Sequence, residues 1–397
     1  MKTTRKTVAI FIALVMLLAL FPASAFAATV NSRERVISLN AADVSEIRIN
    51  TVGNTNWHYT AVDSTYHIVG GSREKGDAVV ITGTSQGTTS KGIIIEASCD
   101  VILDGVDITS SRSVIELRPG VSATLYLTES KNKITTISET AAAIQTTGAT
   151  LIIDGKGSLT ATGGTYGAAI GGSGGVVGLP GLPALYISTS PTTTMIDSAS
   201  GGNGGNGNGA GSIIIKSGII KAIGNYGAGI GSGAGGLGGP AVTGSYTTTP
   251  TKFPNMGFAS GNGGNGGNGG IGGAVAIEGG TITAKSTYGA GIGGGAGGGG
   301  SDGGYGITGH QSGCNGGNGG AGGYISSVTI KGGTVIAESG NFLLFGLTVG
   351  GVSAGIGGAS GGTGGRGGVI DGWDITFVSG NAGNAGNGGG GATFTMS

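Results

Sequence analysis

Aromatic side chains that could contact a ligand gather in four variable segments of an otherwise glycine-rich sequence. The segments span residues 176–200, 237–260, 302–314 and 369–379. The candidate ligand-binding residues in them are Tyr186, Tyr246, Phe253, Phe258, Tyr305, His310, Trp373 and Phe377. Aromatic rings at exposed loop tips can stack on sugar faces or dock into a partner. The alternative is that these rings only pack the tips against one another.

The residue types needed for hydrolysis, metal binding or phosphate binding do not occur at the required spacings. The three histidines, His58, His67 and His310, show no metal-ligand spacing. The glycine runs are followed by no helical pattern that could receive a phosphate. The sequence also lacks a nucleophile elbow and a cysteine–histidine pair. We therefore predict no catalytic residue, no metal and no cofactor, and classify the chain as not an enzyme.

The first 27 residues are typical of a secretory signal. Lys2, Arg5 and Lys6 precede an apolar stretch at 8–21 and an Ala-Phe-Ala cleavage site at 25–27. The apolar stretch is short for a membrane span, and no later one reaches its length. We expect a secreted chain, free or attached to a cell surface, with no membrane span after cleavage.

Composition excludes several classes of partner and fold. Signal removal takes three of the 20 basic residues and leaves a net charge of about −3, which argues against nucleic acid or an anionic membrane as partner. Glycine supplies 94 of 397 residues, but 8 prolines and the lack of a sustained Gly-X-Y period exclude collagen.

A signature of tyrosine, small residues, isoleucine and glycine recurs along the chain. It spans residues 166–171, 226–231 and 288–293, with a serine-led version at 353–357. The isoleucines Ile170, Ile230, Ile292 and Ile356 are 60, 62 and 64 residues apart. A fixed period of this size is typical of a repeat architecture.

A strand pattern with apolar first and third residues recurs seven times. Its segments are 101–103, 125–127, 151–153, 213–215, 275–277, 328–330 and 394–396. Alternation of this kind predicts strands with one buried face. Coils of about 26 residues with three short strands each, glycine corners and one insertion per longer coil explain the spacings. The fold class is therefore all-β, a parallel β-helix (solenoid).

Two ladders follow from stacking these segments. Leu151, Ile213, Val275 and Val328 should form one inward-facing column. The residue after each segment gives a second ladder, which alternates in sign from Asp154 to Lys331 rather than clustering carboxylates: Asp104, Thr128, Asp154, Lys216, Glu278, Lys331 and Ser397. Clustered carboxylates for calcium, as a lyase would need, are thus not expected.

The glycine-rich insertions return through segments with asparagine at every third position, most regularly at 261–270. A period of three with mostly glycine indicates an extended helix of three residues per turn. We predict four out-and-back excursions, at about 171–211, 231–273, 293–323 and 357–391, that form a polyglycine-II layer with asparagine on one outer face. The alternative is a set of flexible linkers.

The domain organisation follows from these patterns. Residues 1–27 are the signal, 28–91 an N-terminal cap with the first coil, and 92–397 the β-helix with its insertions. The segment 28–91 contains strand-like pieces at 66–69 and 78–82, and Trp57 could alternatively form an aromatic sugar platform.

The two cysteines lie in different repeats. We expect no disulfide between them, with Cys99 in the core and Cys314 on an excursion.

Segments 79–84, 93–95, 101–108, 149–155, 158–164 and 167–171 together resemble the secreted β-helical surface proteins of Gram-positive bacteria, which are adhesin-like or carry carbohydrate-binding domains. The resemblance covers roughly residues 66–360. It implies a right-handed parallel β-helix related in shape to polysaccharide lyases, an extracellular location and glycan binding. The long excursions depart from that pattern. In layout only, they are similar to the polyglycine-II bundles of phage tail adhesins and insect antifreeze proteins.

The favoured function is an extracellular binding or adhesion module that presents loop tips to a polysaccharide, a cell-surface glycan or another surface partner. The alternatives are a polysaccharide lyase-like enzyme and a structural or ice-binding protein that uses the glycine layer or threonine rows such as Thr281 and Thr283. The sequence stops at Ser397 on a ladder strand with neither cap nor sorting signal. We expect from this a fragment, or a second domain missing from the sequence.

Overall fold

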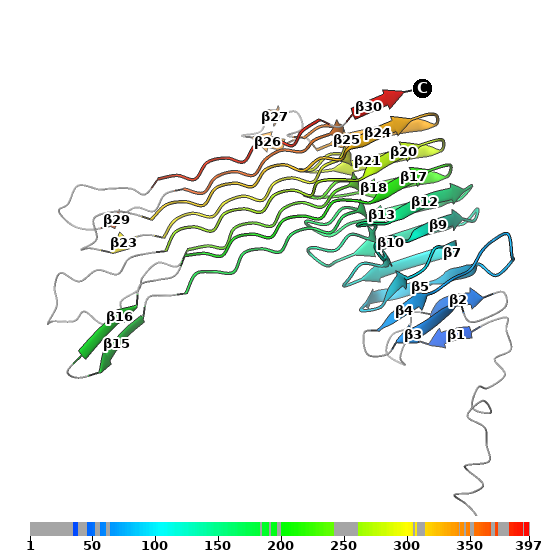
Figure 1. The fold of residues 1–397 in the computed structure, drawn as a ribbon, viewed down its shortest axis with the longest axis horizontal. Coiled ribbons are helices and arrows are strands. Elements are labelled where there is room, and N and C mark those ends of the chain that lie inside the picture. Colours follow the sequence, from blue (N-terminus) through cyan, green and yellow to red (C-terminus); the bar gives the residue numbers. More distant parts are fainter. Residues whose placement is uncertain are drawn as a thin grey trace, which may run out of the picture.

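The computed structural model describes residues 35–38, 46–51, 56–60, 64–182, 185–189, 192–196, 200–241, 261–304, 306–307, 314–340, 342–344, 347–349, 353–366, 370–371, 381–391 and 393–396. Every regular element in them is a β-strand. Figure 1 shows most strands stacked in one body, with long glycine-rich segments running away from it. The predicted signal, residues 1–27, lies outside the described residues.

Three rows of stacked strands build the body. Rows A and B belong to one 15-stranded sheet, and both begin at the long strand β7 (Cys99–Ser110), while row C is a nine-stranded sheet. Row A is β7, β9 (Ser122–Leu127), β12 (Thr150–Gly155), β17 (Ser212–Ile215), β20 (Ala274–Ile277), β24 (Ser327–Ile330) and β30 (Thr393–Met396). Row B is β7, β10 (Lys131–Thr136), β13 (Ser158–Thr162), β18 (Ile219–Ile223), β21 (Thr281–Ser286) and β25 (Thr334–Ser339). Row C is β3 (Trp57–Thr60), β4 (Thr65–Ile68), β6 (Gly92–Ile95), β8 (Ile115–Leu117), β11 (Ile144–Gln145), β14 (Ile170–Gly171), β19 (Ile230–Gly231), β22 (Ile292–Gly293) and β28 (Ile356–Gly357).

The chain visits row A, row B and row C in turn, as in β12, β13 and β14. Within each row neighbouring strands are parallel, apart from the antiparallel pair β3 and β4. This all-β arrangement is solenoid-like, and the fold-class prediction is confirmed to that extent.

The predicted inward column is present in row A. Leu151 pairs with Ile213, Ile213 with Val275, and Val275 with Val328. All four side chains are at most 1 % exposed. The alternating burial of β12, β17 and β20 therefore follows the period-two pattern of their sequences.

The predicted alignment of segments 125–127 and 151–153 is wrong by two residues. Leu151 lies opposite Ala123, and Leu125 lies opposite Ile153. A shift of two residues keeps the same side chains on the buried face, so the period-two pattern cannot detect it. The charge ladder is corrected in the same way, because Tyr126, not Thr128, lies opposite Asp154.

The ladder is present from Asp154 through Lys216 and Glu278 to Lys331, and its last predicted member, Ser397, lies outside the described residues. Lys331 Nζ lies 3.1 Å from Glu278 Oε1. The pKa of Asp154 is lowered, first by the hydroxyl that Ser217 donates to it and more weakly by the positive charge of Lys216. These groups are partly exposed, so they add little stability beyond fixing the register.

The last glycine of each signature has a left-handed backbone. Gly171, Gly231, Gly293 and Gly357 have φ values of 146°, 141°, 153° and 132°. A Cβ at Gly171 would lie 1.7 Å from the carbonyl oxygen of Gly231. Both the φ angle and the close contact between coils therefore require glycine here.

Antiparallel strands lie at the N-terminal end of the stack. β1 (Arg35–Ser38) pairs with β2 (Glu46–Thr51), and β2 pairs with β5 (Val79–Thr89), which is parallel to β7. β4 and β5 confirm the strands predicted at 66–69 and 78–82. Trp57 is partly buried against Tyr66, with ring centroids 6.1 Å apart. Trp57 thus packs on the core, and this contact gives no support to the sugar-platform alternative.

Cys99 is a buried, free thiol, so no disulfide joins it to Cys314. Burial, with a smaller effect of the Asp100 charge, raises the pKa of Cys99 from 9.0 to about 12. The folded state thus favours the neutral thiol, and this stabilisation is present below pH 9 and is lost as the pH rises through about 12.

We expect the thiol of a Cys314→Ser variant to react with a disulfide reagent at pH 8.5 far more slowly in the folded than in the urea-unfolded protein, because the thiolate is the reactive form. A thiol assay measures both rates. Equal rates would show that Cys99 is not buried.

Candidate functional site

Eight extended segments, called legs here, leave the body at one corner. The outgoing legs (172–182, 232–241, 294–304 and 358–366) follow β14, β19, β22 and β28 in row C. The return legs (200–211, 261–273, 314–323 and 381–391) lead back towards β17, β20, β24 and β30 in row A. Figure 1 shows them running in one direction away from the strands.

Legs of the same kind are joined by a backbone hydrogen bond at every third residue. In the return legs Gly204 donates to the carbonyl of Asn265, and Gly266 donates to Asn318, both at 2.8 Å. The outgoing legs are joined in the same way by Gly178 to Leu237, Gly238 to Gly299 and Gly300 to Thr363. Two layers of legs result, one outgoing and one returning.

A second set of hydrogen bonds joins the two layers. Gly267 of the second return leg donates to Gly236 and accepts from Gly298, both at 2.8 Å and both in outgoing legs. A Cβ at Gly267 would lie 1.9 Å from the carbonyl oxygen of Gly205. One residue in three therefore bonds within its layer, one bonds across the layers, and the third faces outwards.

Larger side chains mark the edges of this assembly. At the position of Gly236 and Gly298, the first outgoing leg has Val176, which is 64 % exposed. The last return leg has Ala382 and Ala385, both exposed, where the third return leg has glycine. At these positions Val176, Ala382 and Ala385 thus replace glycine where no further leg of the described residues lies alongside.

The outward positions of the return legs form a surface that we call the asparagine face. Its members are Asn203, Asn206, Asn262, Asn265, Asn268, Asn315, Asn318, Asn381, Asn384 and Asn387, with Ser200 and Ala321 in the two remaining places. All ten asparagines are exposed. The outgoing face is less regular, with Leu237, Gly299 and Thr363 in one column.

Each asparagine column is held together by its side chains. The Oδ1 atom of Asn265 accepts a hydrogen bond of 2.8 Å from the backbone N–H of Asn318, and Asn318 Oδ1 accepts one of 2.8 Å from Asn384. Asn203, Asn206, Asn262, Asn268 and Asn315 act in the same way. The side chains therefore satisfy the outward N–H groups that glycine would leave to water.

The predicted tip residues are not brought together by any described contact. Tyr186 lies in the hairpin of β15 (Leu185–Thr189) and β16 (Thr192–Ile196), where only the backbone is described. Tyr246, Phe253, Phe258, Tyr305, His310, Trp373 and Phe377 lie outside the described residues. The third and fourth tips do meet, because β23 (Gly306–Ile307) pairs in parallel with β29 (Ile370–Asp371). One further hairpin, β26 (Phe342–Leu344) with β27 (Leu347–Val349), lies between β25 and β28.

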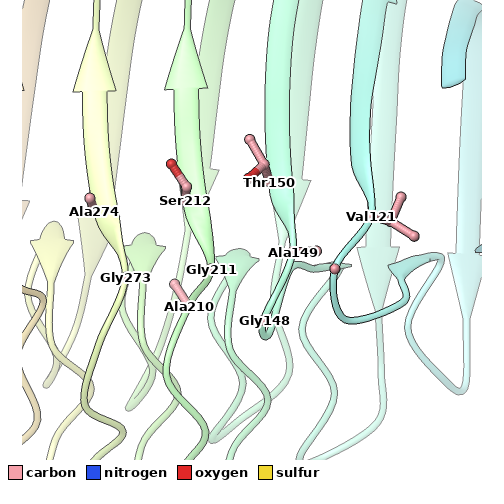
Figure 2. A pocket seen from close by; sticks show the side chains of 10 residues that line it. Val121, Gly148, Ala149, Thr150, Ala210, Gly211, Ser212, Gly273 and Ala274 are labelled. Atoms are coloured by element: carbon pink, nitrogen blue, oxygen red, sulfur yellow. The ribbon is translucent and has the colours of Figure 1, made fainter. Parts of the chain in front are cut away.

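A groove of about 430 Å³ crosses the corner where the return legs rejoin row A (Figure 2). Its lining consists of small residues and one valine: Gly120, Val121, Gly148, Ala149, Thr150, Ala210, Gly211, Ser212, Gly273 and Ala274. No ionisable or aromatic side chain lines it. The lining therefore contains no general base that could activate the hydroxyls of Thr150 and Ser212.

The sequence interpretation missed a stack of tyrosines. The ring centroids of Tyr166 and Tyr226 are 5.4 Å apart, and those of Tyr226 and Tyr288 are 4.3 Å apart. Burial raises the pKa of Tyr166 and Tyr226, with smaller effects of neighbouring groups. The signal that could have predicted this stack is the tyrosine at the first position of each of these three signatures. The carbonyl of Tyr166 also accepts from Ala234, so the stack anchors outgoing legs.

The threonine rows at Thr281 and Thr283 are short. Thr281 pairs with Ile219 and Thr334, and Thr283 pairs with Lys221 and Ile336. A lysine and an isoleucine flank Thr283. A longer column of threonines runs through β5, β7, β10 and β13, where Thr88 pairs with Thr109, and Thr135 pairs with Thr109 and Thr162.

Among the described residues, no group of three or more His, Cys, Asp and Glu side chains could hold a metal ion. The described part also contains no helix that is long and apolar enough to cross a membrane.

No family model, curated protein or solved structure matches the chain.

Proposed function

We propose that this chain is a secreted binding or adhesion module, in which a right-handed parallel β-helix holds four loop tips at the end of a polyglycine-II layer. The two-layer hydrogen bonding of the legs carries the proposal. It joins every leg to its neighbours, as between Gly204 and Asn265 within a layer and between Gly267 and Gly236 across layers. The period of three and the lack of internal hydrogen bonds are those of an extended helix with three residues per turn.

A rigid layer supports presentation of the tips more than it supports a linker. A leg of about 11 residues spans roughly 34 Å at the 3.1 Å rise of such a helix. Ordering so much glycine costs backbone entropy, and a flexible linker would not need to be ordered. The parallel pairing of β23 and β29 places two tips side by side, so their aromatic residues can act on one ligand.

The proposed ligand is a polysaccharide or another surface glycan. Trp373, Tyr246 and Tyr305 belong to the tips, and amphipathic rings suit the apolar faces of sugars. The uncharged groove and the alternating charges of row A give a lyase-like reaction no support.

The test is a glycan array probed with the mature chain and with Trp373→Ala and Tyr246→Ala variants. We expect at least one glycan to bind, and each variant to weaken that binding by about tenfold or more, since a hot-spot aromatic contributes roughly 2 kcal/mol. Thr283→Ala, on row B, serves as the control and should bind normally. Unchanged binding by both variants, or release of unsaturated sugars from a pectin-like substrate, would contradict the proposal.

A further inference from the structure

The asparagine face is a regular grid in which the next leg holds seven of the ten asparagine side chains by a hydrogen bond. Successive positions along one leg are three residues, or roughly 9 Å, apart. Legs joined by backbone hydrogen bonds lie about 5 Å apart. Because Asn265 Oδ1 and Asn318 Oδ1 are each bound to the next leg at 2.8 Å, their side chains are held in one orientation.

This grid presents more hydrogen-bond donors than acceptors, because the Oδ1 atoms of seven of its ten asparagines already accept from the next leg. The side-chain oxygen of Asn265 is taken by Asn318, and its backbone oxygen is taken by Gly204 at 2.8 Å. In contrast, no hydrogen bond among the described residues uses the Nδ2 amide of the ten face asparagines. Each of these amides therefore keeps donors available to an external group.

The grid is also uncharged. The return legs contain no Lys, Arg, Asp or Glu. A ligand that depends on ionic attraction, such as a nucleic acid or a polyanion, thus finds no complementary charge. Ice fits less well, because its surface donates and accepts hydrogen bonds equally, whereas this face presents mainly donors.

We propose that the asparagine face is a binding surface for an ordered, acetyl-bearing polysaccharide. An acetamido or acetyl carbonyl accepts hydrogen bonds, and packed sugar chains repeat it at regular intervals. A flat, rigid donor grid pairs with such a surface with little loss of side-chain freedom, since the neighbouring leg already holds seven of the ten asparagines in place. The tips are not needed for this contact, so the site is separate from the one proposed above.

The test is sedimentation of the mature chain with crystalline chitin and with cellulose, which share a backbone linkage and differ in the acetamido group. We expect binding to chitin and much weaker binding to cellulose. An Asn265→Asp/Asn384→Asp variant keeps the oxygen at position 265 that accepts from the N–H of Asn318, and it replaces both outward amides with carboxylate oxygens. It should lose at least about tenfold in chitin affinity with its melting temperature unchanged.

Two controls separate the possible readings. Asn265→Ser/Asn384→Ser retains an acceptor, as Ser200 does for the N–H of Asn262 at 3.1 Å, and should fold normally while binding chitin weakly. This variant replaces the aspartate variant if the new charges lower its melting temperature. Trp373→Ala should bind chitin normally, so failure of the tip proposal leaves this test intact. No binding to chitin, equal binding to cellulose, undiminished binding by the folded variants, or thermal hysteresis in solution would overturn the inference.

Discussion

Gly267→Ala is expected to lower the free energy of unfolding by about 1–3 kcal/mol, because the added methyl group has no space. Its Cβ would lie 1.9 Å from the oxygen and 2.5 Å from the carbon of the Gly205 carbonyl. The backbone cannot move away, since Gly267 is bonded at 2.8 Å to Gly236 on one side and to Gly298 on the other. Denaturant unfolding followed by circular dichroism measures the loss, and hydrogen exchange should show the leg amides opening.

Gly388→Ala is the matched control. Gly388 lies in the last return leg, three residues after Ala385, at an edge position that already tolerates alanine. Its nearest neighbour would be the oxygen of Ala359, at an ordinary 3.8 Å. A change within about 0.5 kcal/mol is expected. Equal and small effects of both substitutions would mean that the legs are loose linkers, and the proposed presentation of the tips would then fail.

Two sequence periods predicted much of the described structure. The period-two pattern identified the strands of row A and the column from Leu151 to Val328, since burial of one strand face depends on alternation alone. The register between β9 and β12 was missed, because a shift of two residues leaves that alternation intact. Register at this step depends on the path of the whole coil between Leu127 and Thr150, which includes β10 and β11 and which no local pattern encodes.

The asparagine face illustrates a different limit. Its position on one side of the return legs followed from the period of three, as at Asn262, Asn265 and Asn268. The bond from Asn265 Oδ1 to the N–H of Asn318 did not, because it joins residues 53 apart in sequence. Predicting such a bond requires the distance between neighbouring legs, and the sequence of a single leg does not give that distance. The tips lack any period, so the sequence predicts their composition but not the placement of their rings.

Ile213→Ala is expected to cost roughly 2–5 kcal/mol, the range for truncating a buried isoleucine. Ile213 is fully buried and pairs with Leu151 on one side and Val275 on the other, so the cavity would interrupt the inward column in its middle. Because a solenoid is stabilised by contacts between neighbouring coils, weakening one coil weakens two interfaces. Urea unfolding of the mature chain, followed by circular dichroism, measures the change.

Ile214→Ala on the same strand tests whether the effect comes from the inward column. Ile214 lies on the outer face of β17, partly exposed, between Ile152 and Ala276. The same truncation there should cost less than about 1 kcal/mol, because it removes a cross-strand contact and leaves no cavity. A larger loss from Ile214→Ala than from Ile213→Ala would place the core on the other face of row A. The position assigned to the corner from which the legs leave the body would then be wrong as well, because β17 follows directly on Gly211 at the end of the first return leg.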